Sequence, residues 1–141
     1  MPLPTPPFSG GCQCGACRYR VTGAPLRLYV CHCSECRAQS ASAFGISLIV
    51  GADDVRLTAG VPRVWQRPTD SGGRLACSFC PECGTRLFHQ RSSRAQSLSV
   101  KGGTLDDRLD LSQAFHIWTA SKLPGVVIPP GATCHAQEPP D

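Results

Sequence analysis

The sequence predicts a mainly β fold built from many short strands and organised around bound metal. Its apolar runs are short and rich in β-branched and aromatic residues, and 14 Gly and 13 Pro residues help to separate them. Only one short segment favours a helix. In addition, nine of the ten cysteines lie in three tight groups. Many short strands with little helix indicate a β-sandwich or an open barrel.

Each predicted strand is a short run that ends near Gly, Pro, Asp or Ser. In chain order, the predicted strands span residues 16–21, 26–31, 43–50, 55–59, 61–66, 75–79, 85–89, 97–100 and 115–119. Gly60-Val61-Pro62 joins the fourth and fifth of these strands, which we expect to form a hairpin. The one helical segment, a short turn over Ser34–Ser40, begins inside the second cysteine group.

With 141 residues, the chain has the length of one domain. Both ends are rich in proline, so we expect extended tails at residues 1–9 and 124–141 around a domain spanning residues 10–123. The first residues resemble no secretory signal, and no apolar stretch has the length of a membrane span. We therefore expect a cytoplasmic protein without a membrane partner.

The spacing of the cysteines favours metal over disulfides. Neighbouring thiols two or three residues apart rarely meet disulfide geometry, but they converge readily on one zinc ion. A cytosolic chain with this much cysteine is also more often metal-binding than disulfide-bonded. The three groups are Cys12-Cys14-Cys17, Cys31-Cys33-Cys36 and Cys77-Cys80-Cys83.

Two of the groups contain a zinc knuckle, in which a cysteine pair is followed by glycine. These knuckles are Cys12-Gln13-Cys14-Gly15 and Cys80-Pro81-Glu82-Cys83-Gly84. The glycine permits the positive φ of the turn, and a closed four-coordinate site needs two such pairs. A zinc ion held by both knuckles would join an early strand to a late one.

The segment Cys31-His32-Cys33-Ser34-Glu35-Cys36 supplies three sulfurs and has no trailing glycine. Three protein ligands leave a coordination position for water or substrate, which is the layout of a catalytic zinc site. His32 alternates with two expected ligands, so we expect its side chain to point away from the metal. We interpret Cys17 and Cys77 as small buried residues and Cys134 as an exposed thiol. Spacing alone leaves other groupings open, including a shared multi-metal cluster.

The formal charge of +4 is a weak argument for nucleic-acid binding. Seven thiolates and two Zn²⁺ ions together lower that charge by three, to +1. The aromatic residues, 6% of the chain, do not interleave with arginine as in a base-stacking surface. We therefore expect no nucleic-acid partner. The sequence contains no motif that indicates the oligomeric state.

Taken together, the cysteine motifs resemble the glutathione-dependent formaldehyde-activating enzyme (GFA) family, which includes centromere protein V. The match extends from Gly10 to Leu123 and is carried by Gly10–Tyr19, Cys31–Arg37, Phe79–Thr85, Gly103–Asp107 and His116–Trp118. The resemblance implies a zinc-containing β-tent of antiparallel sheets. It also implies a structural zinc at Cys12, Cys14, Cys80 and Cys83 and a catalytic zinc at Cys31, Cys33 and Cys36. Gly125, where the family usually has tryptophan, and the nearly neutral closing segment depart from the pattern.

The activity implied is that of a carbon–sulfur lyase similar to S-(hydroxymethyl)glutathione synthase. Such an enzyme adds a thiol such as glutathione to a small aldehyde such as formaldehyde, or cleaves the adduct. We consider Arg37 either a residue that neutralises the site or binds a substrate carboxylate, or a solvated surface residue. Glu35 is either an acid or base, or simply solvated. Candidate cations for an anionic substrate are Arg18, Arg63, Arg67 and Arg86.

Two other functions are compatible with the residues. One is a zinc-stabilised binding module without turnover, in which His116 or Cys77 closes the Cys31 group as a fourth ligand. The other is a nucleic-acid-binding zinc ribbon, which would show a steep dependence of affinity on salt.

Overall fold

The computed structural model describes residues 3–140 and contains two β-sheets and one short α-helix, α1 (Ser34–Ser40). The smaller sheet has the strand order β1 (Phe8–Gly11), β2 (Arg18–Val21), β5 (Val55–Ala59). The larger, seven-stranded sheet has the order β10 (Phe115–Ile117), β3 (Arg27–Cys31), β4 (Gly45–Gly51), β9 (Ser97–Lys101), β8 (Arg86–Arg91), β7 (Arg74–Phe79), β6 (Arg63–Pro68). Three short 3₁₀ turns complete the fold: η1 (Ala52–Asp54), η2 (Gly102–Thr104) and η3 (Thr119–Ser121).

The mainly β prediction is confirmed, and each of the nine predicted strands overlaps an observed one. The predicted helix over Ser34–Ser40 is also observed. Strand β1 was not predicted, because Phe8–Gly11 lies in a run of proline and glycine and carries one large apolar residue. Neighbouring strands are antiparallel except β10, which pairs with β3 in parallel.

The predicted hairpin over residues 55–66 is wrong. Strand β5 pairs with β2 in the small sheet, and β6 pairs with β7 in the large one. The turn between them crosses from one sheet to the other. Gly60 has a φ of +77° and packs so closely that an added Cβ would lie 2.3 Å from the carbonyl oxygen of Ala16. This close approach holds the turn against the first knuckle instead of folding β6 back on β5.

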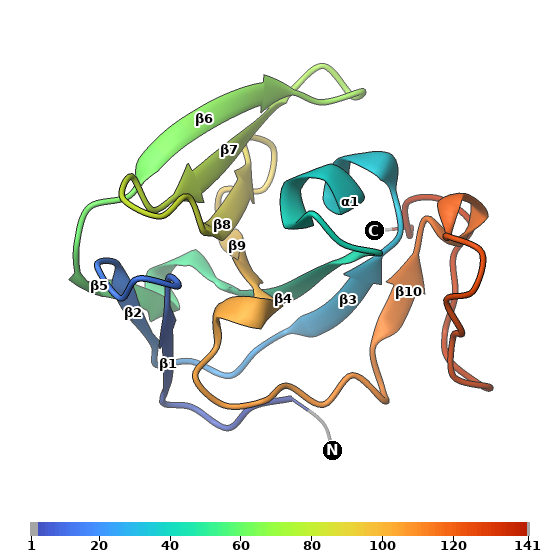
Figure 1. The fold of residues 1–141 in the computed structure, drawn as a ribbon, viewed down its shortest axis with the longest axis horizontal. Coiled ribbons are helices and arrows are strands. Elements are labelled where there is room, and N and C mark those ends of the chain that lie inside the picture. The colour runs from blue at the N-terminus through green and yellow to red at the C-terminus, as the bar shows by residue number, and fades with distance from the viewer. Residues whose placement is uncertain (1–2, 141) are drawn as a thin grey trace.

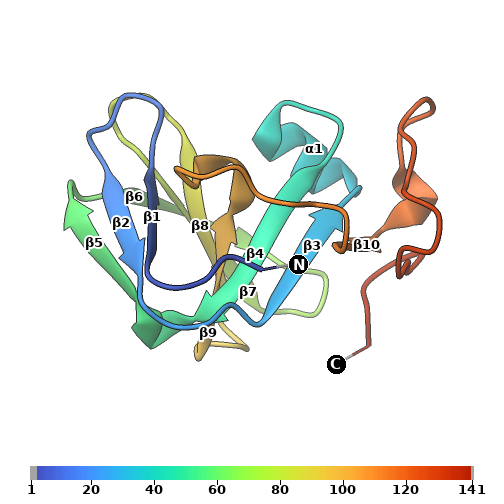
Figure 2. The same cartoon turned by 90° about the horizontal axis from the view of Figure 1, so that it is seen from below.

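The two faces of the large sheet carry different side chains, because successive side chains along each strand point to opposite faces. One face carries Leu48, Val50 and Val100, which are fully buried and pack in a core with Tyr19 and Val21 of the small sheet. In Figures 1 and 2 the small sheet lies toward one end of the large sheet, with α1 and the C-terminal segment toward the other. The opposite face of the large sheet is polar and lines a cavity described below.

Both terminal segments contact the sheets. Phe8 and Ser9, expected in the N-terminal tail, belong to β1. At the other end, the backbone N–H of His116 donates to the carbonyl of Thr133, and that of His135 donates back to His116, both at 2.9 Å. The indole Nε1 of Trp118 donates to Glu138 at 2.9 Å. The domain boundaries at residues 9/10 and 123/124 stay predictions.

Among residues 3–140, no helix is both long and apolar enough to cross a lipid bilayer.

Candidate metal centres and the adjoining cavity

The two knuckles have similar backbone hydrogen bonds. In each, the N–H of the first cysteine, Cys12 or Cys80, donates at 3.0 Å to the carbonyl five residues later. The glycine that follows the second cysteine donates back to the carbonyl of the first, at 3.1 Å for Gly15 and 2.9 Å for Gly84. Both glycines have a φ of +82°, the left-handed conformation for which glycine is favoured. The sequence pattern therefore forms two similar turns, of which the second is one residue longer, and each turn places one buried and one exposed cysteine.

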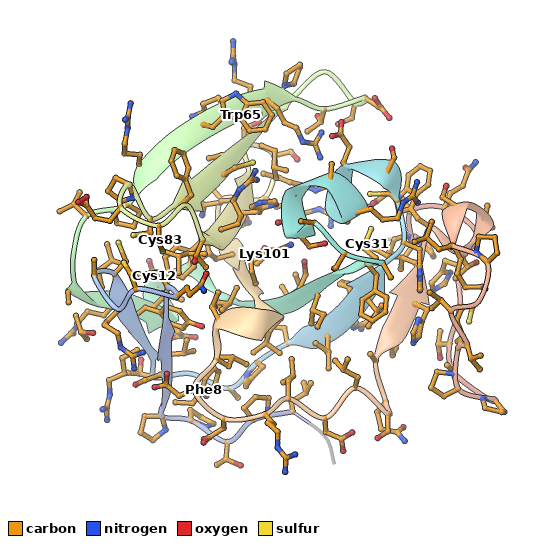
Figure 3. The ribbon with its side chains drawn as sticks, in the orientation of Figure 1. Phe8, Cys12, Cys31, Trp65, Cys83 and Lys101 are labelled. Atoms are coloured by element: carbon orange, nitrogen blue, oxygen red, sulfur yellow. The ribbon has the colours of Figure 1, made fainter. Side chains whose placement is uncertain are left out.

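The knuckles bring Cys12, Cys14, Cys80 and Cys83 together, with all four Sγ atoms within 4.8 Å of one another. Figure 3 shows Cys12 and Cys83 side by side although they come from distant parts of the chain. Donors surround the sulfurs: the N–H of Cys17 lies 3.2 Å from Cys12 Sγ, and the Thr85 hydroxyl lies 3.2 Å from Cys83 Sγ.

The hydroxyl of Thr85, with backbone donors, lowers the pKa of the exposed Cys83 thiol to about 5. A preformed set of four sulfurs, with donors that favour thiolate, fits the tetrahedral coordination that structural zinc requires.

The second cluster forms where β3 runs into α1. Cys31 ends the strand, Cys33 is the N-cap residue of the helix and Cys36 lies in its first turn. The Sγ of Cys33 accepts the N–H of Cys36 at 3.3 Å, so a thiol replaces the usual hydroxyl or carboxylate of an N-cap. The three Sγ atoms lie within 4.8 Å of one another. The helix start therefore aims Cys33 and Cys36 at the strand end that carries Cys31.

The thiols of this cluster differ in acidity. Hydrogen bonds from the Cys31 and Cys36 thiols lower the pKa of Cys33 to about 2, and backbone N–H groups add to the effect. The pKa of Cys31 is raised, because its thiol donates to Cys33 and lies in a buried position. These hydrogen bonds favour the thiolate form of Cys33, which is the form that a metal binds.

Among residues 3–140, no further Cys, His, Asp or Glu places a ligand atom within the Cys31-Cys33-Cys36 group. His116 instead pairs with His32, whose Nε2 lies 3.0 Å from His116 Nδ1. Cys77 is fully buried in β7 and belongs to neither group. The side chain of His32 lies outside the group as well, as the alternation predicts. The three sulfurs thus leave a position for a fourth, external ligand.

A cavity of about 890 Å³ adjoins the three sulfurs and extends over the polar face of the large sheet. Register explains its composition: Tyr29, Ser47 and Lys101 are partners across β3, β4 and β9, and Cys31 pairs with Gly45 two residues away on the same face. Figure 3 labels Cys31, Lys101 and Trp65, all of which line this cavity. Its cationic residues are Arg27, Arg67, Arg86, Arg91, Arg94 and Lys101, and its acidic residues are Glu35, Asp70 and Glu138.

The excess of positive charge gives the cavity a preference for anionic ligands. Lys101 is the most enclosed of these cations, with 6% of its surface exposed. Its Nζ donates to Ser47 Oγ at 2.9 Å. Burial lowers the pKa of Lys101, while the nearby Cys36 and Cys31 sulfurs favour its charged form.

His89 forms part of the same wall as an uncharged imidazole. The guanidinium of Arg86 donates to His89 Nε2 at 2.8 Å, which requires the imidazole proton to lie on Nδ1. Burial, with the charges of Lys101 and Arg86, lowers the pKa of His89 to about 2.

Sequence reasoning missed both Lys101 and His89. The alternation of side chains along a strand could have indicated them, because each lies an even number of residues from a cavity-facing residue of its own strand.

The sequence offered four arginines as candidate cations for an anionic substrate. The structure shows which of them line the cavity. Arg67 and Arg86 line the cavity, whereas Arg18 pairs with Asp106 and Arg63 is exposed on β6 away from the cavity lining. Arg37 is half-buried and not simply solvated, and its role toward the site or a substrate stays a prediction. Its guanidinium donates to the carbonyls of His32 at 2.8 Å and of Ser121 at 2.7 Å. Arg37 therefore ties the cysteine segment to the turn after β10.

The structure also places Glu35 and Cys134. Glu35 is largely exposed at the edge of the cavity, with its carboxylate 3.9 Å from Arg67. Cys134 is exposed, as expected, and bridges to His116 through the backbone.

These features define a class: a small β protein with a closed four-sulfur group, an open three-sulfur group and a cationic cavity beside the open one. The family model described as glutathione-dependent formaldehyde-activating enzyme matches residues 7–121. The chain therefore belongs to the GFA family. Its two cysteine clusters could each hold a metal ion and are consistent with zinc.

The fold is similar to that of a solved Rhodobacter sphaeroides protein. That crystal structure superposes with a TM-score of 0.56 at 23% sequence identity. The alignment covers 91% of this chain and 99% of the other. At this identity, the likeness supports the fold of both sheets and carries no functional argument.

Proposed function

We propose that this protein is a zinc-dependent carbon–sulfur lyase that adds a thiol such as glutathione to a small aldehyde such as formaldehyde, or cleaves the adduct. The observation that carries the proposal is the open group of Cys31, Cys33 and Cys36 at the wall of a cationic cavity. In this proposal, each chain binds two zinc ions. Cys12, Cys14, Cys80 and Cys83 hold the structural ion, and the open group holds the catalytic one.

When bound at the open group, Zn²⁺ would supply a coordination position for a soft sulfur ligand and a modest Lewis acidity. The residues of the chain prepare the group for the ion and position it. The hydrogen bonds to Cys33 favour its thiolate form, which is the form that binds the ion. The N-cap geometry of Cys33 fixes two of the three ligands relative to each other. The rigid strand and helix start then hold the open position toward the cavity.

The cavity has the size and charge for a thiol with carboxylate groups. Its volume of about 890 Å³ lies within the range of small-molecule pockets, roughly 300–1,000 Å³. Arg67 and Arg86 lie on its wall, where they would attract a carboxylate and orient the thiol toward the three sulfurs. A cytoplasmic location, where thiols stay reduced, is part of this proposal.

The test follows adduct formation from glutathione and formaldehyde by NMR, with protein purified without added zinc. We expect the protein to accelerate the approach to equilibrium and to contain two zinc equivalents per chain. The matched protein control is Cys36→Ala, which should retain one equivalent and lose the acceleration. Equal rates with and without the wild-type protein would overturn the proposed reaction. Four protein ligands at both ions, counted by zinc-edge spectroscopy, would instead support a non-catalytic zinc-stabilised binding module.

A further inference from the structure

We propose that Lys101 is the catalytic residue that binds the aldehyde oxygen while the sulfur–carbon bond forms or breaks. The inference rests on the proposed function and adds a residue to it. It is carried by an enclosed lysine side chain, with Nζ 2.9 Å from Ser47 Oγ, that shares a cavity with the three sulfurs of the open group.

The register of the large sheet places Lys101 close to the open group. Lys101 on β9 pairs with Ser47 on β4, and Gly45, two residues from Ser47, pairs with Cys31. A Cβ added at Gly45 would lie 3.1 Å from the Cys36 Cβ and 3.4 Å from its Sγ. Glycine therefore lets this strand lie directly beneath the cluster, where the Gln39 side chain also packs, with its Nε2 2.9 Å from the same Cβ position.

The hydrogen bonding of Lys101 leaves donors available for a ligand. A lysine ammonium has three N–H donors, and a buried lysine usually has an anionic partner. Here the hydrogen-bond acceptor of Nζ is Ser47 Oγ at 2.9 Å. Within residues 3–140, no carboxylate oxygen lies within the 4.0 Å ion-pair distance of Nζ. Two donors thus remain to bind an oxygen that gains negative charge.

Several other cations of the cavity already have partners within the chain. Arg86 donates to His89 at 2.8 Å, Arg91 lies 3.4 Å from Glu138, and the Arg27 guanidinium lies over the ring of Phe115 at 4.5 Å. Lys101 is also more enclosed than these arginines. An enclosed charge acts more strongly on a developing oxyanion than an exposed one, because less water screens it.

The proposed step is the addition of a thiol to a carbonyl group. The sulfur of the thiolate forms a bond to the carbonyl carbon, and the π electron pair of the carbonyl moves to its oxygen. The Lys101 ammonium donates hydrogen bonds to that oxygen as it becomes negative. The proton that the thiol released then ends on the oxygen, which gives the hydroxyl of the adduct. Cleavage is the reverse, and no oxidant or reductant is required.

The first test compares Lys101→Met with Lys122→Met, since Lys101 and Lys122 are the two lysines of the chain. Lys122 Nζ donates to the carbonyl of Val126 at 2.7 Å and does not line the cavity. We expect Lys101→Met to lower kcat for formaldehyde on the order of 100-fold, as expected for the loss of an oxyanion donor. Zinc content should stay at two equivalents, and Lys122→Met should keep wild-type rates. Unchanged kcat in Lys101→Met would overturn the proposal.

The second test does not depend on turnover. It measures by calorimetry the affinity of zinc-loaded protein for thioglycolate and for ethanethiol. Both ligands offer sulfur, but thioglycolate also places an anionic oxygen near that sulfur. The wild type should bind thioglycolate more tightly than ethanethiol. In Lys101→Met the ratio of the two affinities should fall by about tenfold or more, which is the effect expected for the loss of a charged hydrogen bond. Lys101→Gln, which keeps a donor for Ser47, serves if the methionine variant does not fold.

The two tests separate the two proposals. Absence of turnover by the wild type would overturn the proposed reaction. If the Lys101 variants prefer thioglycolate over ethanethiol as strongly as the wild type does, the proposed role of Lys101 is overturned.

Discussion

The Nε2 atom of His32 lies 3.0 Å from Nδ1 of His116, and the two imidazole rings are stacked. Both side chains are buried, and His32 stands between two cysteines of the open group. This contact joins the cysteine segment at the end of β3 to β10, which lies 84 residues later in the chain. The position of the open group therefore depends on a residue that lies far away in sequence.

We expect His116→Phe to destabilise the protein by about 1–3 kcal/mol, because it leaves buried His32 Nε2 without a partner. The free energy of unfolding, measured with urea, checks this value. His135→Phe is the control, since His135 contacts β10 through its backbone. Equal stability of the two variants would contradict the structural role of the histidine pair.

The two cysteine groups should differ in what their loss does. Cys83→Ala should reduce folding yield, because under the proposed function its knuckle pair holds the structural ion that joins distant strands. Cys36→Ala should release one zinc equivalent and leave the protein folded. Circular dichroism and metal content measure the two effects, with the exposed Cys134→Ala as a control that changes neither. A folded Cys83→Ala protein that keeps both ions would refute the assignment.

Gly84 should tolerate alanine poorly although nothing lies within 4 Å of the added Cβ. Its φ of +82° is strained for any L-residue, at a cost of about 1–2 kcal/mol. Gly103→Ala is the matched control, because its Cβ also meets open space and its φ is not positive. Thermal unfolding of the zinc-loaded variants should therefore show a lower Tm for Gly84→Ala alone.

Stability should fall as the pH drops below about 6.5, in part because of His89. Its pKa is about 2 in the folded protein and 6.5 as the ordinary value, so the unfolded chain binds more protons in this range. His89→Asn should remove this contribution, and its slope below pH 6 should be shallower by up to about 1.4 kcal/mol per pH unit. Urea unfolding between pH 7.5 and 5.5 measures the slope. Parallel curves for wild type and variant would show that the pKa of His89 is the same in the folded and the unfolded protein, which would contradict the prediction.

Arg67 and Arg63 lie on the same strand but only Arg67 lines the cavity. Under the proposed function, Arg67→Gln should raise KM for glutathione by about tenfold or more, because charged hydrogen bonds to a carboxylate contribute about 1.5–3 kcal/mol when well formed. KM for a neutral thiol such as 2-mercaptoethanol should change little. Arg63→Gln should leave both values unchanged, and equal effects of the two variants would argue against carboxylate binding at Arg67.

The sequence alone determined the features that depend on neighbouring residues. The grouping of Cys12 and Cys14, and of Cys80 and Cys83, follows from a pair of cysteines and one glycine, and in both turns the glycine has a positive φ and donates to the first cysteine. The helix start after Cys31 was likewise predictable, since its cap and its candidate metal ligands lie within six residues. Short strands were predicted well because alternation and turn residues act locally.

Only the tertiary structure decided which strands pair and what each face of the sheet meets. The pairing of β5 with β2 instead of β6 depends on the packing of Gly60 against the first knuckle. The cavity, with Lys101 and His89 on its wall, exists because register brings side chains from all seven strands of the large sheet together. Such long-range register is an outcome of packing the whole core, so no local pattern in the sequence encodes it.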